Sequence, residues 1–202
     1  MFDAALVARL KSPLSRIAKP LVQRGVTANQ LTWIGFGIGV LGALAVSLDA
    51  LEWALACLLL NRLLDGLDGA VARASTPTDA GAFLDIVLDF LIYSLYPLAF
   101  ALRDPSDALA AAFLIFCFVT TGTTFLAFSI FAKARGLENS RLKEKSIYYL
   151  EGLTEGFETL LVLCAMCLFP GWFQIIAMGF GGLCLVTASM RIHRGFTLLR
   201  GN

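Results

Sequence analysis

The sequence predicts an all-α, polytopic membrane protein with six transmembrane helices preceded by an amphipathic helix at the membrane surface. Of the 202 residues, 58% are hydrophobic and 15% are charged, and the mean hydropathy is +0.77. Apolar windows close to the roughly 20 residues that a bilayer core requires recur along the chain. They cover residues 30–49, 51–70, 83–102, 108–132, 150–168 and 172–190. Because no polar stretch is long enough to bury its own core, we expect one transmembrane domain over residues 25–202.

Residues 1–24 are predicted to form the surface helix. Their apolar and basic side chains interleave: Phe2, Leu6, Leu10, Leu14, Ile17 and Leu21 alternate with Arg9, Lys11, Arg16 and Lys19. Such a helix lies in the membrane interface, where anionic lipids attract its cations. The alternative, a solvated helix, is less favoured because we expect no soluble core on which it could dock.

The first span is predicted to begin at Thr27 or Asn29, either of which can cap a helix. It contains a formal G-x-G-x-x-G at Gly37, Gly39 and Gly42. No strand precedes these glycines, so we do not expect a dinucleotide site. In an apolar helix, small residues instead allow neighbouring helices to pack closely.

Four aspartates lie where the second span ends and the third begins. Asp65 and Asp68 are three residues apart, and Asp85 and Asp89 are four apart, so each pair projects from one helical face. Carboxylates at membrane depth are costly unless they hold a cation or are paired, which makes this cluster a functional-site hypothesis. The connection between the two helices, residues 74–80, is short. We therefore expect the pairs to converge on one or two divalent ions.

Charge is distributed unevenly between the two sides of the predicted bundle. Every one of the 16 Lys and Arg residues except Arg103 falls on the side that holds both termini, the link between the second and third spans, and the charged link 133–147. The positive-inside rule makes that side cytoplasmic. We expect a bacterial inner-membrane protein with its active site on the cytoplasmic face. On the other side, Pro105 ends one helix and Asp107 is predicted to cap the next.

Three glutamates mark the start of the fifth span. Glu151, Glu155 and Glu158 follow the spacing i, i+4, i+7, which predicts one helical face directed at the bundle interior or a watery cavity. The alternative is that Glu151 and Glu155 are interfacial and solvated.

The cysteines and the histidine carry little functional information. All five cysteines fall inside predicted spans, and Cys164-x-x-Cys167 has no second pair, so we interpret them as small apolar residues. A single histidine, His193, argues against histidine-based zinc or triad chemistry.

The aspartate cluster suits phosphoryl-type transfer. Hard divalent cations prefer carboxylates, waters and substrate phosphates, and four carboxylates can offset the charge of two such ions. Gly66 and Gly69 leave room beside the acids, and Arg73 supplies a fixed cation for phosphate. At the membrane boundary this set fits a lipid-linked pyrophosphate as substrate.

The string Asp65-x₂-Asp68-Gly69-x₂-Ala72-Arg73-x₇-Gly81-x₃-Asp85-x₃-Asp89 resembles the signature of the CDP-alcohol phosphatidyltransferase family. The usual pattern has eight residues before the second glycine, whereas this chain has seven. The stretch Val26-Thr27-Ala28-Asn29-Gln30-Leu31-Thr32 also looks like the family's entry to the first span, with Ala28 where proline is common. Residues 145–156 are similar to a bacterial inner-membrane branch of the family.

The resemblance implies a reaction and a division of roles. An acceptor hydroxyl would attack the lipid-side phosphorus of CDP-diacylglycerol or a related CDP-alcohol, and CMP would leave. Asp65, Asp68, Asp85 and Asp89 would hold two Mg²⁺ or Mn²⁺ ions, with Asp89 also the general base. The nucleotide and pyrophosphate pocket would be shaped by Gly69, Ala72, Arg73 and Gly81. Members are commonly homodimers, and no nucleic-acid partner is expected.

The acceptor is less well defined by the sequence. Family members that use phosphorylated polyols look to have arginines at the start of the fifth helix, where this chain has an acidic and hydroxylic stretch. We expect Glu155 and Glu158 to face the acceptor and to favour a neutral or cationic alcohol. Lys133 and Arg135 leave glycerol 3-phosphate open as an acceptor.

Two other classes of function compete with an enzyme. A cation or metabolite transporter also uses buried acids, but transporter sites tend to lie near the midplane between inverted repeats, and no repeat is visible here. A purely structural membrane protein would leave the four acids undercompensated, because Arg62 and Arg73 could neutralise only half of them.

Overall fold

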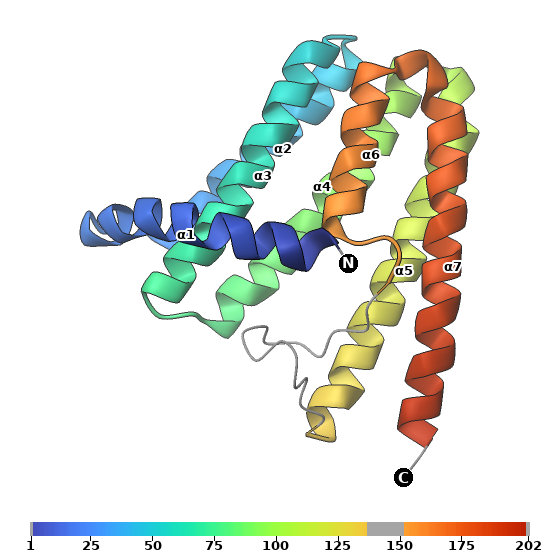
Figure 1. Ribbon diagram of the computed structural model, residues 1–202. Coiled ribbons are helices and arrows are strands. Elements are labelled where there is room, and N and C mark those ends of the chain that lie inside the picture. The colour runs from blue at the N-terminus through green and yellow to red at the C-terminus, as the bar shows by residue number, and fades with distance from the viewer. Residues whose placement is uncertain (1, 137–151, 201–202) are drawn as a thin grey trace.

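The computed structural model describes residues 2–136 and 152–200, with side chains from Pro13 onward. The regular elements of these ranges are all helices, which confirms the predicted all-α class (Figure 1). Seven α-helices and two short 3₁₀ helices follow in order: α1 (Phe2–Gln23), α2 (Ala28–Ser47), α3 (Leu51–Ala74), α4 (Asp79–Arg103), η1 (Pro105–Asp107), α5 (Ala108–Ala134), α6 (Gly156–Leu168), η2 (Pro170–Trp172) and α7 (Phe173–Arg200).

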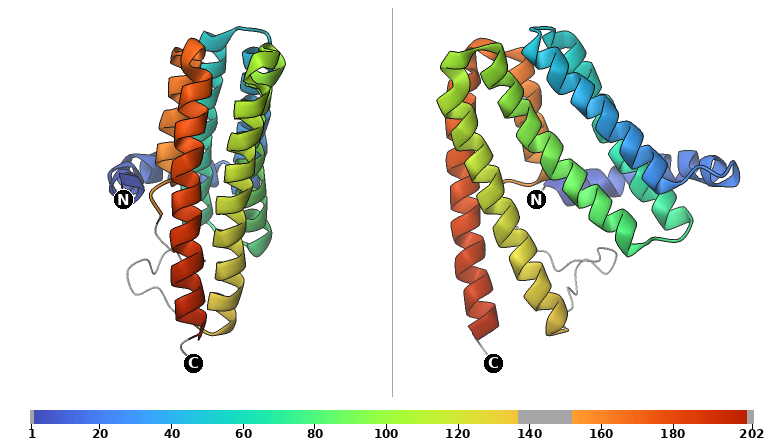
Figure 2. Two further views of the ribbon diagram at one scale, coloured as in Figure 1. Left: turned by 90° about the vertical axis from the view of Figure 1, so that its right-hand side faces the viewer. Right: turned by 180° about the vertical axis from the view of Figure 1, so that it is seen from behind.

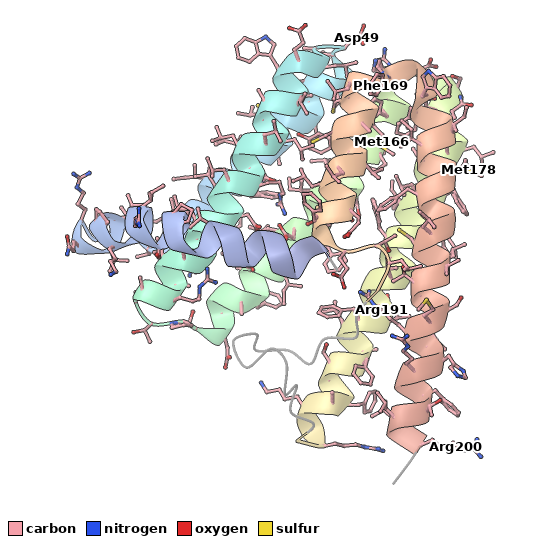
Figure 3. All side chains as sticks on the ribbon, in the orientation of Figure 1. Asp49, Met166, Phe169, Met178, Arg191 and Arg200 are labelled. Carbon is pink, nitrogen blue, oxygen red and sulfur yellow. The ribbon has the colours of Figure 1, made fainter. Side chains whose placement is uncertain are left out.

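Helices α2 to α7 form a bundle, and α1 crosses it at a steep angle (Figures 1 and 2). Helix α2 packs against α3 and α4, and α5 packs along α7. The end that bears Asp49 and Phe169 lies opposite the end that bears Arg200 (Figure 3).

Within residues 2–136 and 152–200, four helical segments are long and apolar enough to cross a membrane: Ala28–Ser47, Asp79–Arg103, Pro105–Ala134 and Pro170–Arg200. Helix α3 has 24 residues but carries the charged cluster, and α6 has 13 residues. Large apolar side chains remain exposed around the bundle, among them Leu41, Trp53, Leu109 and Ile175. An apolar outer surface of this kind is expected of a protein that is solvated by lipid, and the chain is an integral membrane protein.

Fully buried aromatic and aliphatic side chains fill the bundle towards the Phe169 end. Tyr96 and Phe100 of α4 meet Leu114, Leu163 and Phe173, and the Phe100 and Phe173 rings stack 4.5 Å apart. Tyr96 also donates a hydrogen bond to the carbonyl of Ala54 at 3.1 Å, so the phenol hydroxyl is satisfied within the core. The core thus occupies one end, and the charged cluster is left to the other.

The glycine run of α2 serves helix packing, as predicted, at two of its three positions. A Cβ at Gly39 would lie 2.5 Å from Ile92 Cδ1, and one at Gly42 would collide with the Tyr96 hydroxyl. At Gly37, none of the described neighbours lies within 4 Å of an added Cβ. The α2–α4 contact therefore depends on Gly39 and Gly42 being small.

Helix ends match the predictions in part. Thr27 is the N-cap of α2 and forms a capping box with Gln30, which confirms one of the two candidates. Asp107 caps α5 without a side-chain hydrogen bond. Asp104 instead accepts the Ser106 N–H at 2.9 Å, and its hydrogen bonds with Ser106 hold the pKa of Asp104 below its usual value. Asp107 therefore occupies the predicted N-cap position of α5, but its side chain makes no capping hydrogen bond.

The N-terminal segment forms a helix, α1, and this helix has a docking surface that the sequence did not indicate. Leu14, Ala18 and Leu21 pack with Leu31 of α2 and Val71 of α3, whereas Ile17 is half exposed. The bundle itself supplies the partner that a soluble core would have supplied.

Candidate active site

Three of the four aspartates converge as the spacing predicted. Asp65 and Asp68 lie in the last three turns of α3, and Asp85 lies in the second turn of α4. One carboxylate oxygen from each of the three lies within 4.8 Å of the other two. Thr78, at the end of the connecting turn, accepts the Gly81 N–H at 3.0 Å and so fixes the start of α4. Both helices thus deliver their acids to one point.

The three carboxylates fit a hard divalent cation. All four aspartates line a small cavity of about 10 Å³, with Thr32 and Asn61 also in its wall. That volume is close to the space one water molecule needs. The Thr32 hydroxyl donates to Asp68 Oδ2 at 2.6 Å and orients that carboxylate. Oxygen donors in this number and spacing are those that Mg²⁺ and Mn²⁺ prefer, in agreement with the cofactor expected from the sequence.

Asp89 stands apart from the other three acids. Its Oδ1 accepts a hydrogen bond from Nη2 of Arg62 at 2.6 Å. The same guanidinium lies 3.7 Å from Asp65 Oδ2 through Nη1. The sequence pointed to Arg62 only as a nearby compensating charge, and the direct pairing with Asp89 was not anticipated.

The residues expected around a nucleotide surround the end of α3. The Arg73 guanidinium lies over Gly69, where a Cβ would come within 3.2 Å of Nη1. Gly81 allows α4 to approach Asn29 of α2, since a Cβ there would lie 3.0 Å from Asn29 Oδ1. Ala72 is half-buried beside exposed Arg73. Arg73 is thus presented to solvent close to the carboxylates.

A larger cavity of about 450 Å³ adjoins the aspartates, a volume typical of small-molecule sites. Asp85 and Asp89 line both cavities. Arg73 lies in the wall of the larger cavity, and the remaining lining comes from α4, α5, α6, α7 and the segment before α6. The acids therefore open onto a space large enough for a substrate.

Glu155 and Glu158 do not share a helical face, and that prediction is wrong. Helix α6 begins at Gly156, so Glu155 is its extended N-cap rather than a helical residue. The Glu158 carboxylate accepts the Glu155 N–H at 3.2 Å, and the Glu155 carboxylate accepts the Gly152 N–H at 3.1 Å. The acids satisfy backbone donors that a longer helix would have paired. Glu151 lies outside the described residues.

Glu155 nevertheless reaches the larger cavity. It is 7% exposed and lines the wall together with Thr154 and Gly156. Glu158 is not among the described lining residues. The same holds for Lys133 and Arg135, which lie at the end of α5, where Arg135 Nη1 donates to the Leu199 carbonyl at 2.6 Å.

Among the residues of the larger cavity that the sequence did not predict as site residues, Arg191 is the described one that carries a charge. It lies on α7 (Figure 3) and is 7% exposed. Its guanidinium donates to the Thr121 carbonyl at 3.4 Å and lies over the Phe125 ring at 5.6 Å. It lines the larger cavity. The available signal was an arginine within the extension of an apolar helix, where a charge is costly unless it has a role.

The sequence model of the CDP-alcohol phosphatidyltransferase family matches residues 25–188. The chain is 48% identical over 204 residues to the inner membrane protein YnjF of Escherichia coli K12, covering 99% of this chain and 98% of that protein. An archaetidylinositol phosphate synthase of Pyrococcus horikoshii is 43% identical over 84 residues, covering 41% of this chain and 45% of that protein.

Solved structures share the fold. Phosphatidylinositol phosphate synthase of Mycobacterium tuberculosis, with CDP-DAG bound, superposes with a TM-score of 0.71 at 24% sequence identity. The match covers 91% of this chain and 94% of that one. The same enzyme in complex with manganese and citrate gives a TM-score of 0.70, also at 24% identity, over 91% of this chain and 89% of that one. At 24% sequence identity, the similarity to these two structures shows a shared fold.

The family assignment agrees with the chemistry of the site. Carboxylates for a divalent metal, an arginine beside them and an adjoining cavity are the parts expected for transfer of a phosphate-linked group from a CDP-alcohol to an acceptor hydroxyl. The chain therefore belongs to the CDP-alcohol phosphatidyltransferase family and is a membrane-embedded transferase of phospholipid synthesis.

Proposed function

We propose that the protein transfers the phosphatidyl group of CDP-diacylglycerol to an acceptor alcohol at the boundary between the two cavities. The observation that carries this proposal is that Asp85 and Asp89 belong to both walls, the carboxylate cluster and the substrate-sized space. The acceptor oxygen forms a bond to the lipid-side phosphorus, and the bond from that phosphorus to the CMP phosphate oxygen breaks. CMP departs as an anion, and the hydroxyl proton passes to Asp89.

Four carboxylates are assigned to metal binding in this proposal. Asp65, Asp68 and Asp85 would hold one divalent ion, and Asp65, Asp85 and Asp89 would hold a second. When bound, the ions would neutralise charge on the transferred and departing phosphates. Thr32 orients Asp68 through its 2.6 Å hydrogen bond.

The nucleotide end of the donor is assigned to the surface around the end of α3. Gly69, Ala72 and Gly81 keep this surface low, so that the pyrophosphate can approach the backbone. Arg73 is exposed and lines the larger cavity, so its fork of N–H groups can bind a phosphate in two contacts.

For the acceptor we infer a neutral or cationic alcohol held in the larger cavity. The described residues that line this cavity carry charges of both signs. Glu155, Asp85 and Asp89 are acidic, and Arg73 and Arg191 are basic. Lys133 and Arg135, the two residues that left glycerol 3-phosphate open, are not among the described lining residues, whereas Glu155 is.

The membrane arrangement is part of the proposal. Helices α2 to α7 are taken as six spans of a domain over residues 25–202, with residues 1–24 as an interfacial helix. Both termini and the aspartates then face the cytoplasm. We assign the protein to the inner membrane by similarity to the E. coli relative. We expect a homodimer because members of the family are commonly homodimers.

Purified protein tests the reaction directly. CDP-diacylglycerol, Mn²⁺ or Mg²⁺ and a panel of alcohols are supplied, and CMP release is followed. We expect Asp89→Asn or EDTA to abolish release, and Asp104→Asn, an exposed acid at the opposite end of the bundle, to leave it intact. CMP release that survives either EDTA or Asp89→Asn would contradict the mechanism.

A further inference from the structure

Arg62 is held rigidly at the side of the aspartate cluster. Its Nη2 donates to Asp89 Oδ1 at 2.6 Å, Nη1 donates to the Tyr93 hydroxyl at 3.1 Å, and Nε donates to Asn61 Oδ1 at 2.8 Å. The guanidinium also lies 5.3 Å from the centre of the Tyr93 ring. Asn61 is anchored in turn by its hydrogen bond to the Gly35 carbonyl at 2.9 Å. With 11% of its side chain exposed, Arg62 is a fixed charge rather than a solvated one.

The position of this charge divides the four aspartates into two sets. Asp65, Asp68 and Asp85 gather within 4.8 Å of one another. Asp89 is bound by Arg62 instead, and the same guanidinium reaches to 3.7 Å from Asp65 Oδ2. The arginine therefore lies between the two carboxylates that a second ion would have to share.

On the basis of the proposed function, we propose that Arg62 competes with the second divalent ion for Asp89 and so makes the two ions bind with unequal affinity. A guanidinium and a metal ion both take carboxylate oxygens as ligands, and Asp89 Oδ1 is already engaged by Arg62. An ion shared by Asp65 and Asp89 must displace that contact against the repulsion of a nearby positive charge. The first ion, at Asp65, Asp68 and Asp85, leaves it intact.

The arrangement also explains how the acids are tolerated before metal arrives. Uncompensated carboxylates in a poorly hydrated site are strongly destabilising. Arg62 supplies one internal cation to Asp89, the carboxylate that the first ion does not use. Arg62 is thus a positioning residue that sets the affinity for the second ion. Asp89 becomes available to the acceptor hydroxyl only after that ion has displaced Arg62 from it.

Titration with Mn²⁺ in detergent, without donor or acceptor, tests this role independently of activity. Free Mn²⁺ is followed by its electron paramagnetic resonance signal. Wild-type protein is expected to show a strong and a weak binding event. Arg62→Gln is expected to tighten the weak event at least tenfold and to change the strong one less than threefold. Arg103→Gln removes an arginine that is paired with Asp49 at the opposite end of α4, and it is the charge-matched control, with less than threefold effect on either event.

Tyr93→Phe provides a second variant that keeps the ring and removes only the hydroxyl that accepts from Arg62. We expect it to tighten the weak event about threefold, so the test does not depend on whether Arg62→Gln folds. Two equal wild-type events, or a weak event that is unchanged or weaker in both variants, would overturn the role of Arg62. Wild-type protein that binds no Mn²⁺ would instead contradict the proposed function itself.

Discussion

Thr154 donates its hydroxyl to the hydroxyl of Thr187 at 3.0 Å, although the two residues belong to different elements and are 33 positions apart. The oxygen of Thr187 also accepts the backbone N–H groups of Leu153 and Thr154, both at 3.2 Å. Thr187 is completely buried on α7. One side chain of α7 therefore fixes the segment that delivers Glu155 to the larger cavity.

Replacing Thr187 by valine should raise the KM for the acceptor more than the KM for CDP-diacylglycerol. Valine keeps the shape of threonine but lacks the hydroxyl oxygen that accepts the hydrogen bonds of Leu153 and Thr154. The loss leaves these buried donors unsatisfied, at a cost of about 1–3 kcal/mol. Steady-state kinetics with each substrate varied in turn measures the split. Thr187→Ser should restore both constants, and an equal rise of the two KM values would contradict a specific role for this segment.

Replacing Gly152 by alanine should disrupt the same segment through crowding. A Cβ at this position would collide with the Thr187 methyl group and lie 3.0 Å from Arg191 Nη2. Forced repacking of this kind costs about 1–3 kcal/mol. We expect a lower melting temperature in detergent and weaker acceptor binding. Gly179→Ala on α7, where a Cβ would have no atom of the described residues within 4 Å, is the control and should leave both unchanged.

The sequence predicts the short-range features of the fold and of the candidate site better than the long-range ones. The convergence of Asp65, Asp68 and Asp85 followed from helical spacing and a short link, which are local properties of the chain. The pairing of Arg62 with Asp89 depends on how α3 and α4 are rotated about their axes, and the spacing does not determine this rotation. The start of α6 was misplaced because Glu155 reads as a helical residue until its segment is bonded to Thr187.

The glycines of α2 allow a paired test of helix packing. Gly42→Ala would place a methyl group against the Tyr96 hydroxyl and 2.9 Å from Cys57 Cβ, whereas Gly37→Ala meets nothing within 4 Å. We expect Gly42→Ala to lower the melting temperature. Gly37→Ala should leave the melting temperature equal or raise it, because alanine is more stable than glycine in a helix interior by about 0.5–1 kcal/mol. Equal effects of the two substitutions would contradict the α2–α4 packing described here.

Removing the Thr32 hydroxyl should weaken metal binding without touching a metal ligand. Its 2.6 Å hydrogen bond orients Asp68 Oδ2, and loss of such an outer partner typically costs about 10–100-fold in metal affinity. Thr32→Val is expected to raise the Kd of the stronger Mn²⁺ event by about tenfold in a direct titration. Thr120→Val removes a hydroxyl that bonds the Phe116 carbonyl of its own helix and should have no effect. An unchanged Kd in Thr32→Val would exclude the orienting role.

Substitutions of Glu155 and Glu158 distinguish a role in acceptor binding from a role in capping α6. Glu155 lines the larger cavity, whereas Glu158 is bound to the backbone N–H of Glu155. If the acceptor is cationic, Glu155→Gln removes a charge-assisted contact and should lower kcat/KM for that alcohol about tenfold or more. Glu158→Gln keeps an oxygen for the cap and should change stability slightly and acceptor preference not at all. A shift of preference in Glu158→Gln, or none in Glu155→Gln across the whole acceptor panel, would place the acceptor away from this segment.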